Sequence, residues 1–484
     1  MMASSRRRDV PRSKAYSQGH KELSDGPLSR ENVTILPCQR EDSVFWKWDQ
    51  VRDDIVRRID LTHVSTVACY RVETSHSPSK TNPTIIVSGN HARYPGATQE
   101  ARDIINAVLL KYKPVEVQVK FLEGQYSRYA SHLSERNAPK RDVDEAGSRV
   151  FHDDIIQLQS LPGQSLALHG NDSTSGTLGD FFELKFPGST HSTVMGLTCF
   201  HVIDPTTAPT VNVREDKVEQ WRKSGIKPVD RMARELKVDH PSPRAIRNKT
   251  RALEKEIDKI QTPEYNLNEE LVSYGVELKR GVKTRHLEAS KQLRHLRALL
   301  GNLQAFDANF GRVWAASGLR IGQAASIDGG NNDLPTVHDW ALIKVPRERA
   351  VRNITPEGHR LKGGPVPELV DKLELCISGQ RSGYSEGYYN SLRPARIHRN
   401  EVDGKDSVIV IIEHSILAKS NEDSFFSKNG DSGSLVYTKD HVVVGLLFAG
   451  DLDAPYTSCF THIHDVVTHI KRATGASEVC LWEG

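Results

Sequence analysis

The sequence predicts a mainly β protein that carries an inserted α-helical hairpin and a small α+β module on its N-terminal side. From Pro162 onward, short apolar segments alternate with clusters of Gly, Asp and Ser, a pattern typical of the many short strands of a sandwich or barrel. Residues 213–305 interrupt this pattern with many Lys, Arg, Glu and Leu residues, and residues 41–125 mix strand and helix patterns. The length of 484 residues agrees with about three domains of ordinary size.

The beginning of the chain is basic and poor in apolar residues. Residues 1–30 hold seven Lys or Arg and three acidic residues, whereas the whole chain has a net charge of only +3. We expect residues 1–40 to form a disordered basic tail that is solvated rather than bound to a partner. The rest of the chain is close to neutral, which argues against nucleic acid as a partner.

Residues 41–125 are predicted to form the α+β module. Apolar residues at helical spacing indicate helices in it, and alternating β-branched residues indicate strands. The segment Ser88–His91 lacks the glycine spacing of a phosphate-binding loop, and no cofactor is predicted. The polar residues 126–160 are expected to form a linker or an exposed helix. In chain order, the module should contain a helix, two strands, a helix and a strand, at 41–60, 64–72, 84–88, 97–112 and 115–122.

The β-rich region is expected to span residues 161–475, with a terminal helix at 463–472 and a short C-terminal tail at 476–484. Inside it, residues 213–305 carry two apolar stripes separated by Pro263, which predicts a helical hairpin that projects from the β domain. Packing within the hairpin is favoured over a partner-binding coiled coil, because a stable coiled coil needs three or four sustained heptads. Binding of a protein partner, or self-association, through these helices is the alternative that the sequence also allows. The stripes consist of Ile246, Leu253, Ile257 and Ile260, and of Leu293, Leu296, Leu300 and Leu303.

Composition excludes several classes of protein. No apolar run approaches the roughly 18–20 residues that span a bilayer, and no hydrophobic segment follows the basic start, so we expect neither a membrane partner nor a secretory signal. The six cysteines lie far apart and lack the spacing of a metal site. We therefore predict reduced thiols, no metal, and an intracellular location in the cytoplasm or the nucleus.

Three segments carry residue types that nucleophilic catalysis needs. The tetrapeptide Gly430–Gly433 places Ser432 in a tight turn, where backbone N–H groups can stabilise an oxyanion; an ordinary hairpin turn is the alternative reading. His201 follows an apolar strand, and Asp339 precedes another. A serine nucleophile needs a base and a group that orients the base, so the three residues together are more telling than each alone.

These segments resemble those of the trypsin-like serine peptidases of the chymotrypsin fold (the PA clan). The segment Gly196–Val202 resembles that clan's strand ending in the catalytic histidine, Asp339–Ile343 its aspartate segment, and Gly430–Gly433 its nucleophile turn. The resemblance implies a mainly β, chymotrypsin-like double barrel of six strands each. The helical insertion and the N-terminal module are similar to those of uncharacterised intracellular fungal members. Weaker matches are Gly176–Gly179, Gly379–Gly387, Gly445–Gly450 and Thr461–Ile463.

The resemblance also implies roles for individual residues. Ser432 is expected to be the nucleophile, His201 the general base and Asp339 the group that fixes the imidazole tautomer. The N–H groups of Gly430 and Ser432 would form the oxyanion hole, and a polypeptide substrate would be hydrolysed through an acyl-enzyme. The substrate-binding residues implied are Phe426, Phe448, Ala449 and Gly450.

The chain departs from the secreted members of that clan at several positions. Val202 stands where they have a cysteine, Ser434 where they usually have a glycine, and His201 and Asp339 are unusually far apart. Because no activation site is evident, activation through a new N-terminus paired with Asp431 is not expected.

Two functions follow from these observations. The first is an intracellular serine endopeptidase, in which the His201 and Ser432 side chains should approach hydrogen-bond distance. The alternative is a catalytically silent protease-fold scaffold that binds partners through the hairpin and the N-terminal module. A third possibility, a helical or nucleic-acid-binding adaptor, has no motif to support it. Cys199, two residues before His201, is expected to be a reduced packing thiol on the same side as the histidine.

Overall fold

The structure is a computed structural model, and its described residues cover most of the chain. They are 33–74, 81–113, 116–124, 126–128, 161–207, 213–324, 335–350, 352–402, 405–419, 425–451 and 457–484. The expected basic tail at 1–40 lies outside them except for its last residues, as does most of the expected linker at 126–160. Among the described residues, none of the helices combines the length and the apolar character that crossing a membrane requires.

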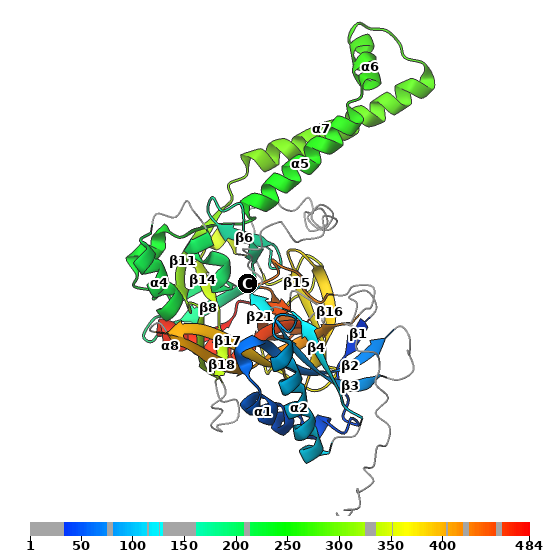
Figure 1. Cartoon of the computed structure of the whole chain (residues 1–484). Helices are drawn as coiled ribbons and strands as arrows, with labels where there is room; N and C mark the ends of the chain where they lie inside the picture. The colour runs from blue at the N-terminus through cyan, green and yellow to red at the C-terminus, as the bar shows by residue number, and fades with distance from the viewer. Residues whose placement is uncertain are drawn as a thin grey trace, which may run out of the picture.

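The α+β module at the start of the described chain is a mixed sheet covered by two helices (Figure 1). Its strands β1 (Val33–Leu36), β2 (Val64–Thr74), β3 (Asn82–Gly89) and β4 (Gln118–Glu123) are joined by α1 (Trp48–Arg58) and α2 (Pro95–Tyr112). Strand β3 pairs with β4 in parallel, and the other pairs of the sheet are antiparallel. The helices and strands expected within 41–125 therefore match those that the structure contains. Strand β1 differs from the expectation that residues 1–40 are disordered, and it is ordered by its antiparallel pairing with β2.

The sheet of the module is completed by a hairpin from much later in the chain. Strands β17 (Ala395–Val402) and β18 (Lys405–Ile412) extend it in the order β18-β17-β2-β3-β4. Side chains alternate between the two faces, as a strand requires: Val67 and Ile85 pack under the helices, whereas Tyr70 and Ile86 pack with Leu417 of the second barrel. The module is thus joined to the β region by direct strand pairing.

A buried arginine ties the module to that region. Arg396 on β17 is fully buried, and its guanidinium donates to Thr66 Oγ1 on β2 at 2.5 Å and to Thr457 Oγ1 at 2.7 Å. The same group lies 3.8 Å from the buried carboxylate of Glu413. A buried charge persists only when it is paired and hydrogen-bonded in this way.

The first barrel is an eight-stranded curled sheet in the order β23-β8-β9-β14-β11-β10-β6-β7. Its ends are brought together because Leu178 N donates to Gln164 O and Gly179 N donates to Leu197 O, each at 2.8 Å. The strands are β6 (Ser165–Leu168), β7 (Gly176–Thr177), β8 (Phe181–Lys185), β9 (Ser192–Thr198), β10 (Lys237–Asp239), β11 (Asn309–Ala316), β14 (Ala341–Lys344) and β23 (Glu478–Leu481).

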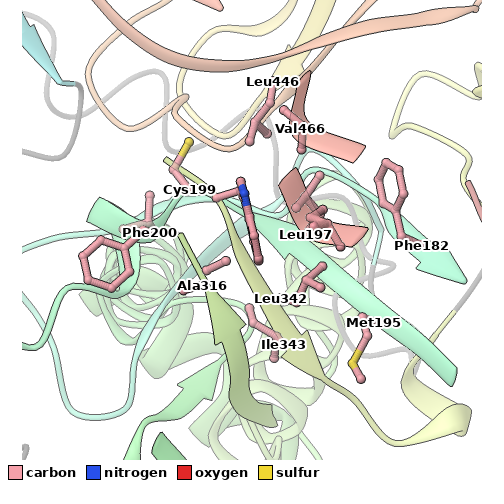
Figure 2. Close-up of a cluster of buried hydrophobic side chains, with 14 of the residues drawn as sticks. Phe182, Met195, Leu197, Cys199, Phe200, Ala316, Leu342, Ile343, Leu446 and Val466 are labelled. Atoms are coloured by element: carbon pink, nitrogen blue, oxygen red, sulfur yellow. The ribbon is translucent and has the colours of Figure 1, made fainter. Parts of the chain in front are cut away.

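The core of this barrel is filled by apolar side chains of β8, β9, β11 and β14. Figure 2 shows Leu197, Leu342 and Ile343 among them, close to Cys199 and Phe200, the residues just before His201. Burial of side chains of this size stabilises a fold by about 1.5–3 kcal/mol each relative to exposure. The histidine segment is therefore attached to a rigid, well-packed base.

The second barrel closes completely. Its strands follow the order β20-β15-β16-β19-β22-β21, and β20 pairs back with β21. A seventh strand, β5 (Tyr126–Arg128), pairs with β21 outside this ring. The ring consists of β15 (Glu374–Gly379), β16 (Gly383–Asn390), β19 (His414–Ala418), β20 (Leu435–Thr438), β21 (Val443–Asp451) and β22 (Thr457–His462), followed by helix α8 (Ile463–Thr474). The two sheets confirm the predicted mainly β, chymotrypsin-like double barrel.

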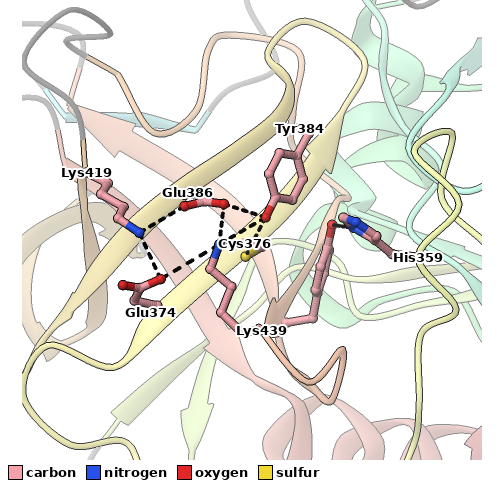
Figure 3. Close-up of polar contacts among 8 residues, drawn as sticks. His359, Glu374, Cys376, Tyr384, Glu386, Lys419 and Lys439 are labelled. Atoms are coloured by element: carbon pink, nitrogen blue, oxygen red, sulfur yellow. Dashed lines mark hydrogen bonds and ion pairs between the residues drawn. The ribbon is translucent and has the colours of Figure 1, made fainter.

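A polar network lies on the second barrel, formed by side chains of β15, β16 and neighbouring segments (Figure 3). Glu386 accepts from Lys419 Nζ at 3.1 Å and from the Tyr384 hydroxyl at 2.7 Å, and it also pairs with Lys439. These contacts hold the pKa of Glu386 at about 2, with Lys439 as the main cause. The network joins adjacent strands and touches none of the three predicted catalytic residues.

The helical insertion projects away from both barrels (Figure 1). Helices α5 (Pro243–Ile260) and α7 (Arg280–Ala305) pack along each other, and α6 (Pro263–Ser273) lies at the far end. Leu253 and Leu303 form the buried contact between the two stripes, with Ile246, Leu296 and Leu300 around it. The stripes pack within the hairpin, as the sequence indicates.

Besides the end of the basic tail, two expected boundaries differ from the observed ones. The first part of the expected insertion contains α4 (Glu215–Ser224) and the barrel strand β10, so the projecting hairpin begins at Pro243 rather than at residue 213. Residues 476–484, expected as a tail, contain β23, which pairs with β8. In both cases the strand has only three or four residues, too few for alternation to reveal it from the sequence.

Candidate active site

His201 and Asp339 are brought together by neighbouring strands of the first barrel. His201 lies in a short 3-10 turn, Phe200–Ile203, just after β9, and Asp339 lies between β13 (Pro335–His338) and β14. Strand β14 pairs with β9, with Ala341 opposite Thr198. This register places the two residues side by side although 138 positions separate them in the chain.

The aspartate holds the histidine through two hydrogen bonds. Asp339 Oδ2 lies 2.6 Å from His201 Nδ1, and Asp339 Oδ1 accepts the His201 backbone N–H at 3.0 Å. A carboxylate can only accept, so Nδ1 carries the proton and Nε2 is left with its lone pair. Within the described part of the chain, Nε2 is buried and has no hydrogen-bond partner. The imidazole is therefore oriented as a base with an uncommitted acceptor.

Ser432 lies on a tight turn at the seam between the barrels. Gly430 and Gly433 on either side have φ of +107° and +97°, a region that side chains with a Cβ rarely adopt. A Cβ at Gly433 would also lie 2.2 Å from Thr177 O. The turn therefore requires glycine on both sides of Asp431 and Ser432.

The serine hydroxyl does not bond to the histidine in this structure. Ser432 Oγ donates to Phe448 O at 3.2 Å, and both the Ser432 side chain and Phe448 are buried. The expected hydrogen bond between Ser432 and His201 is not formed, because the hydroxyl donates to a carbonyl of the neighbouring strand β21 instead. Contact between the predicted nucleophile and the predicted base would require the hydroxyl to leave Phe448 O.

Strand β7 connects the two halves of the site. Thr177 N donates to Ser432 O at 2.8 Å, and Thr177 Oγ1 donates to Gly430 O at 3.0 Å. A Cβ at Gly176 would lie 2.2 Å from Val202 Cγ2 and 2.9 Å from Ser432 O. The absence of a side chain at Gly176 is what lets the histidine turn and the serine turn approach from opposite sides.

Asp431 fixes the serine turn from behind. Its buried carboxylate accepts the backbone N–H groups of Arg381 at 2.7 Å, Ser382 at 3.2 Å and Lys428 at 2.7 Å, and also the Ser382 hydroxyl. Burial raises the pKa of Asp431, whereas these donors oppose the rise. The donors all come from inside the chain, so the turn is held without the charge of a newly created N-terminus.

The predicted oxyanion donors have no competing acceptor. Within the described residues, neither the Gly430 N–H nor the Ser432 N–H donates to another group of the chain. The Gly430 carbonyl, in contrast, is held by Thr177 and by Gln380 Nε2 at 2.8 Å. Amides that are free while the surrounding turn is fixed are suited to stabilise a developing negative charge.

Cys199 lies beside the histidine–aspartate pair. Its buried thiol is reduced, and it donates to Leu447 O at 3.2 Å. The ligand atoms of Cys199, His201 and Asp339 all lie within 4.8 Å of one another. Because Nδ1 of the histidine is already bonded to the carboxylate, this group is organised as a hydrogen-bonded pair with a packing thiol beside it.

The four predicted substrate-binding residues do not share one environment. Phe426 is fully buried in the core of the second barrel, with Val436 and Phe460. It is a core residue here because its ring fills the interior beside Gly387, where a Cβ would lie 2.7 Å from it. Phe448, Ala449 and Gly450, in contrast, follow one another on β21 next to the Ser432 hydroxyl.

No family model matches this sequence, and no curated protein does. Among solved structures, the chain is similar to Thermobifida fusca Protease A, with 9% identity, 67% of this chain and 98% of that chain covered, and a TM-score of 0.30. It is also similar to the Nocardiopsis Protease, with 10% identity, 67% and 98% coverage and a TM-score of 0.28. A glutamic acid specific serine protease is 8% identical, with 66% and 100% coverage and a TM-score of 0.29. Because these TM-scores are low, the chemistry of the site has to be judged from its own geometry.

Proposed function

We propose that this protein is a serine endopeptidase that cleaves polypeptides through an acyl-enzyme on Ser432. The observation that carries the proposal is the pair formed by His201 and Asp339, in which the imidazole keeps Nε2 free as a base. Such a pair, next to a serine in a tight turn between glycines, is the combination that activates a hydroxyl for attack.

The proposed reaction begins with rotation of the Ser432 hydroxyl from Phe448 O to His201 Nε2. Oγ then attacks the carbonyl carbon of the scissile bond while Nε2 takes the hydroxyl proton. The same proton is delivered to the leaving amine as the C–N bond breaks. Water, deprotonated by Nε2, then attacks the acyl carbon, and Nε2–H returns this proton to Ser432 Oγ as the C–O bond of the acyl-enzyme breaks.

Two further groups support each step. Asp339 keeps Nδ1 protonated and stabilises the imidazolium that forms when Nε2 accepts a proton. The Gly430 and Ser432 amides are assigned to the oxyanion of the tetrahedral intermediate, where one such donor contributes about 10²–10³-fold to the rate. Asp431 contributes indirectly, since it holds the turn that presents these amides.

The proposal is tested by labelling the native protein with a fluorophosphonate probe. We expect labelling that is lost in Ser432→Ala and retained in Ser434→Ala, a neighbouring buried serine whose hydroxyl donates to Asp431 O instead. Circular dichroism and thermal unfolding establish that each variant is folded. Labelling that persists in Ser432→Ala, or folded wild-type protein that does not label at all, contradicts the proposal.

One observation favours the second candidate, a scaffold without turnover. The tip of the projecting insertion exposes large apolar side chains, a feature of surfaces that contact other proteins. A scaffold of this kind binds a partner through the insertion while Ser432 stays unreactive, so the labelling experiment separates the two functions. The exposed residues are Leu267, Val272, Tyr274, Val276 and Leu287.

A further inference from the structure

The serine turn and strand β5 pair with consecutive stretches of the same edge of β21. At the start of β21, Leu446 pairs with Leu435 of β20. At the next position, Leu447 O accepts from Gly433 N and Leu447 N donates to Ser434 O. Phe448 O then accepts the Ser432 hydroxyl. The pairing with β20 has ended at this point, so the remainder of this edge is available to another strand.

Strand β5 takes that remainder. Arg128 lies opposite Ala449, Ser127 opposite Gly450 and Tyr126 opposite Asp451, in antiparallel pairing. The chain in β5 therefore runs toward Phe448, with Arg128 as its end nearest to the serine turn. A single residue of β21, about 3.3 Å of strand, separates the pairing of β5 from that of the serine turn.

An extended polypeptide that binds to a sheet edge does so by the same backbone pairing. The proposed substrate-binding residues Ala449 and Gly450 are the ones that β5 already occupies. A substrate whose scissile carbonyl is to reach Ser432 would pair along this edge as well. Two strands cannot take the same edge at once.

The N-terminal module holds β5 at this edge. Two residues separate the start of β5 from the end of β4 at Glu123, and β4 is fixed by parallel pairing with β3. The module is in turn attached to the second barrel through the pairing of β2 with β17 and through buried Arg396. In Figure 1 the blue and cyan elements of the module lie against the yellow and orange strands of that barrel.

We propose that residues Tyr126–Arg128 are an intramolecular competitor, which occupies the edge of β21 where a polypeptide substrate pairs and so keeps the Ser432 site closed. The inference rests on the function proposed above, since it assigns a regulatory role to the same site. The proposal agrees with the burial of the two predicted catalytic residues. Ser432 is fully buried, and His201 is only 5% exposed. A strand of three residues contributes few hydrogen bonds, each of modest net worth, so a longer substrate can displace it.

The test uses the full chain with proline substitutions in β5. Successive N–H groups of a strand point to opposite sides, so one of Ser127→Pro and Arg128→Pro removes a donor that faces β21 and the other removes a donor that faces away. Ser127→Ala and Arg128→Ala keep both N–H groups and are the matched controls. Thermal unfolding shows whether each variant keeps the fold.

We expect at least one proline variant to raise the rate of fluorophosphonate labelling of Ser432 about tenfold, whereas both alanine variants label at the wild-type rate. The same variant should lose hydrogen-exchange protection at residues 449–451. Measurable labelling that proceeds at the same rate in all folded variants, or unchanged protection at 449–451, would overturn the competitor role. If no variant labels while protection at 449–451 is still lost, β5 is displaced as expected and it is the peptidase function that fails.

Discussion

The carboxylate of Asp339 bonds to His201 twice, through Oδ2 at Nδ1 and through Oδ1 at the backbone N–H. The second bond ties the orientation of the carboxylate to the main chain of the histidine turn, so the ring and its partner are positioned as one unit. The helical insertion between Pro243 and Ala305 does not disturb this unit, because β9 and β14 pair directly with each other. The helical hairpin leaves the barrel and returns to it without separating the two strands.

Asp339→Asn should abolish most of the activity while leaving the fold intact. The amide oxygen can still accept from the His201 backbone, but the amide nitrogen would then face Nδ1 and donate to it, which moves the imidazole proton to Nε2. An Nε2 that already carries a proton cannot accept the one from Ser432. We expect the labelling rate to fall by about 10⁴-fold, the loss that the wrong imidazole tautomer causes in a serine–histidine–aspartate triad.

The matched control for this variant is Asp204→Asn. Asp204 is also buried and follows the same histidine turn, but its carboxylate accepts from Thr206 and pairs with Arg222 instead. Its labelling rate should stay within a few-fold of wild type. If both variants lost labelling to the same extent, both carboxylates would affect labelling only through the stability of the fold.

Gly176→Ala should destabilise the seam between the barrels and slow the labelling of Ser432. The new methyl group would lie 2.2 Å from Val202 Cγ2 and 2.9 Å from Ser432 O, so the histidine turn or the serine turn has to shift. Overpacking of this kind costs about 1–3 kcal/mol in the free energy of unfolding. The measurement is denaturant unfolding together with the labelling rate.

Two further variants show whether the crowding itself is responsible. Gly301→Ala places a methyl group in open space on α7 and should be neutral or stabilising by up to about 1 kcal/mol. Adding Val202→Ala to Gly176→Ala removes the nearest clashing atoms and should recover part of the lost stability. No recovery in the double variant would place the cost at the Ser432 backbone.

The residues of the proposed site could be predicted from the sequence because each lies in a local pattern. His201 and Asp339 stand at the ends of apolar strands, and Ser432 stands between glycines that its turn requires. A local pattern identifies a strand but not its partner in space. It therefore could not show that β17 joins the N-terminal module or that β5 pairs with β21.

Other features depended on packing that no spacing rule describes. Phe426 precedes the serine by six positions, yet its ring turns into the core of the second barrel because Gly387 leaves room for it. The Ser432 hydroxyl bonds to Phe448 O because β21 presents a carbonyl there. Both outcomes follow from contacts between segments that lie apart in the chain.

Asp180 should make the stability of the protein fall as the pH rises. Its carboxyl group is fully buried, Oδ1 accepts from Phe181 N at 3.2 Å, and Oδ2 has no partner among the described residues. Burial therefore raises its pKa well above the usual value. The folded protein then binds a proton that the unfolded chain releases near pH 4, so stability is greatest below that pH and declines as the pH rises toward the pKa of the folded state.

Asp180→Asn removes this dependence, since an amide does not titrate. The difference in the free energy of unfolding between variant and wild type should shift in favour of the variant as the pH rises from 4 to 7. Asp172→Asn, in which an exposed carboxylate paired with Arg247 is replaced, should show no such shift. A difference for Asp180→Asn that is constant across this range would contradict the raised pKa.

Glu386 should have the opposite pH dependence, and a small one. Lys439, Tyr384 and Lys419 stabilise its charged form and lower its pKa to about 2, so its contribution is present above the unfolded pKa near 4 and is lost as the pH falls toward 2. Because the side chain is 28% exposed, solvent screens these pairs, and Glu386→Gln should cost only about 0.5–1 kcal/mol at pH 7. Glu256→Gln, which breaks one exposed pair with Lys259 on α5, should cost less than about 0.5 kcal/mol. Urea unfolding at pH 7 in low and high salt measures both effects, and salt should reduce the cost of Glu386→Gln. If that cost is no larger than the cost of Glu256→Gln, then Glu386 and its three partners act as separate surface pairs rather than as a network.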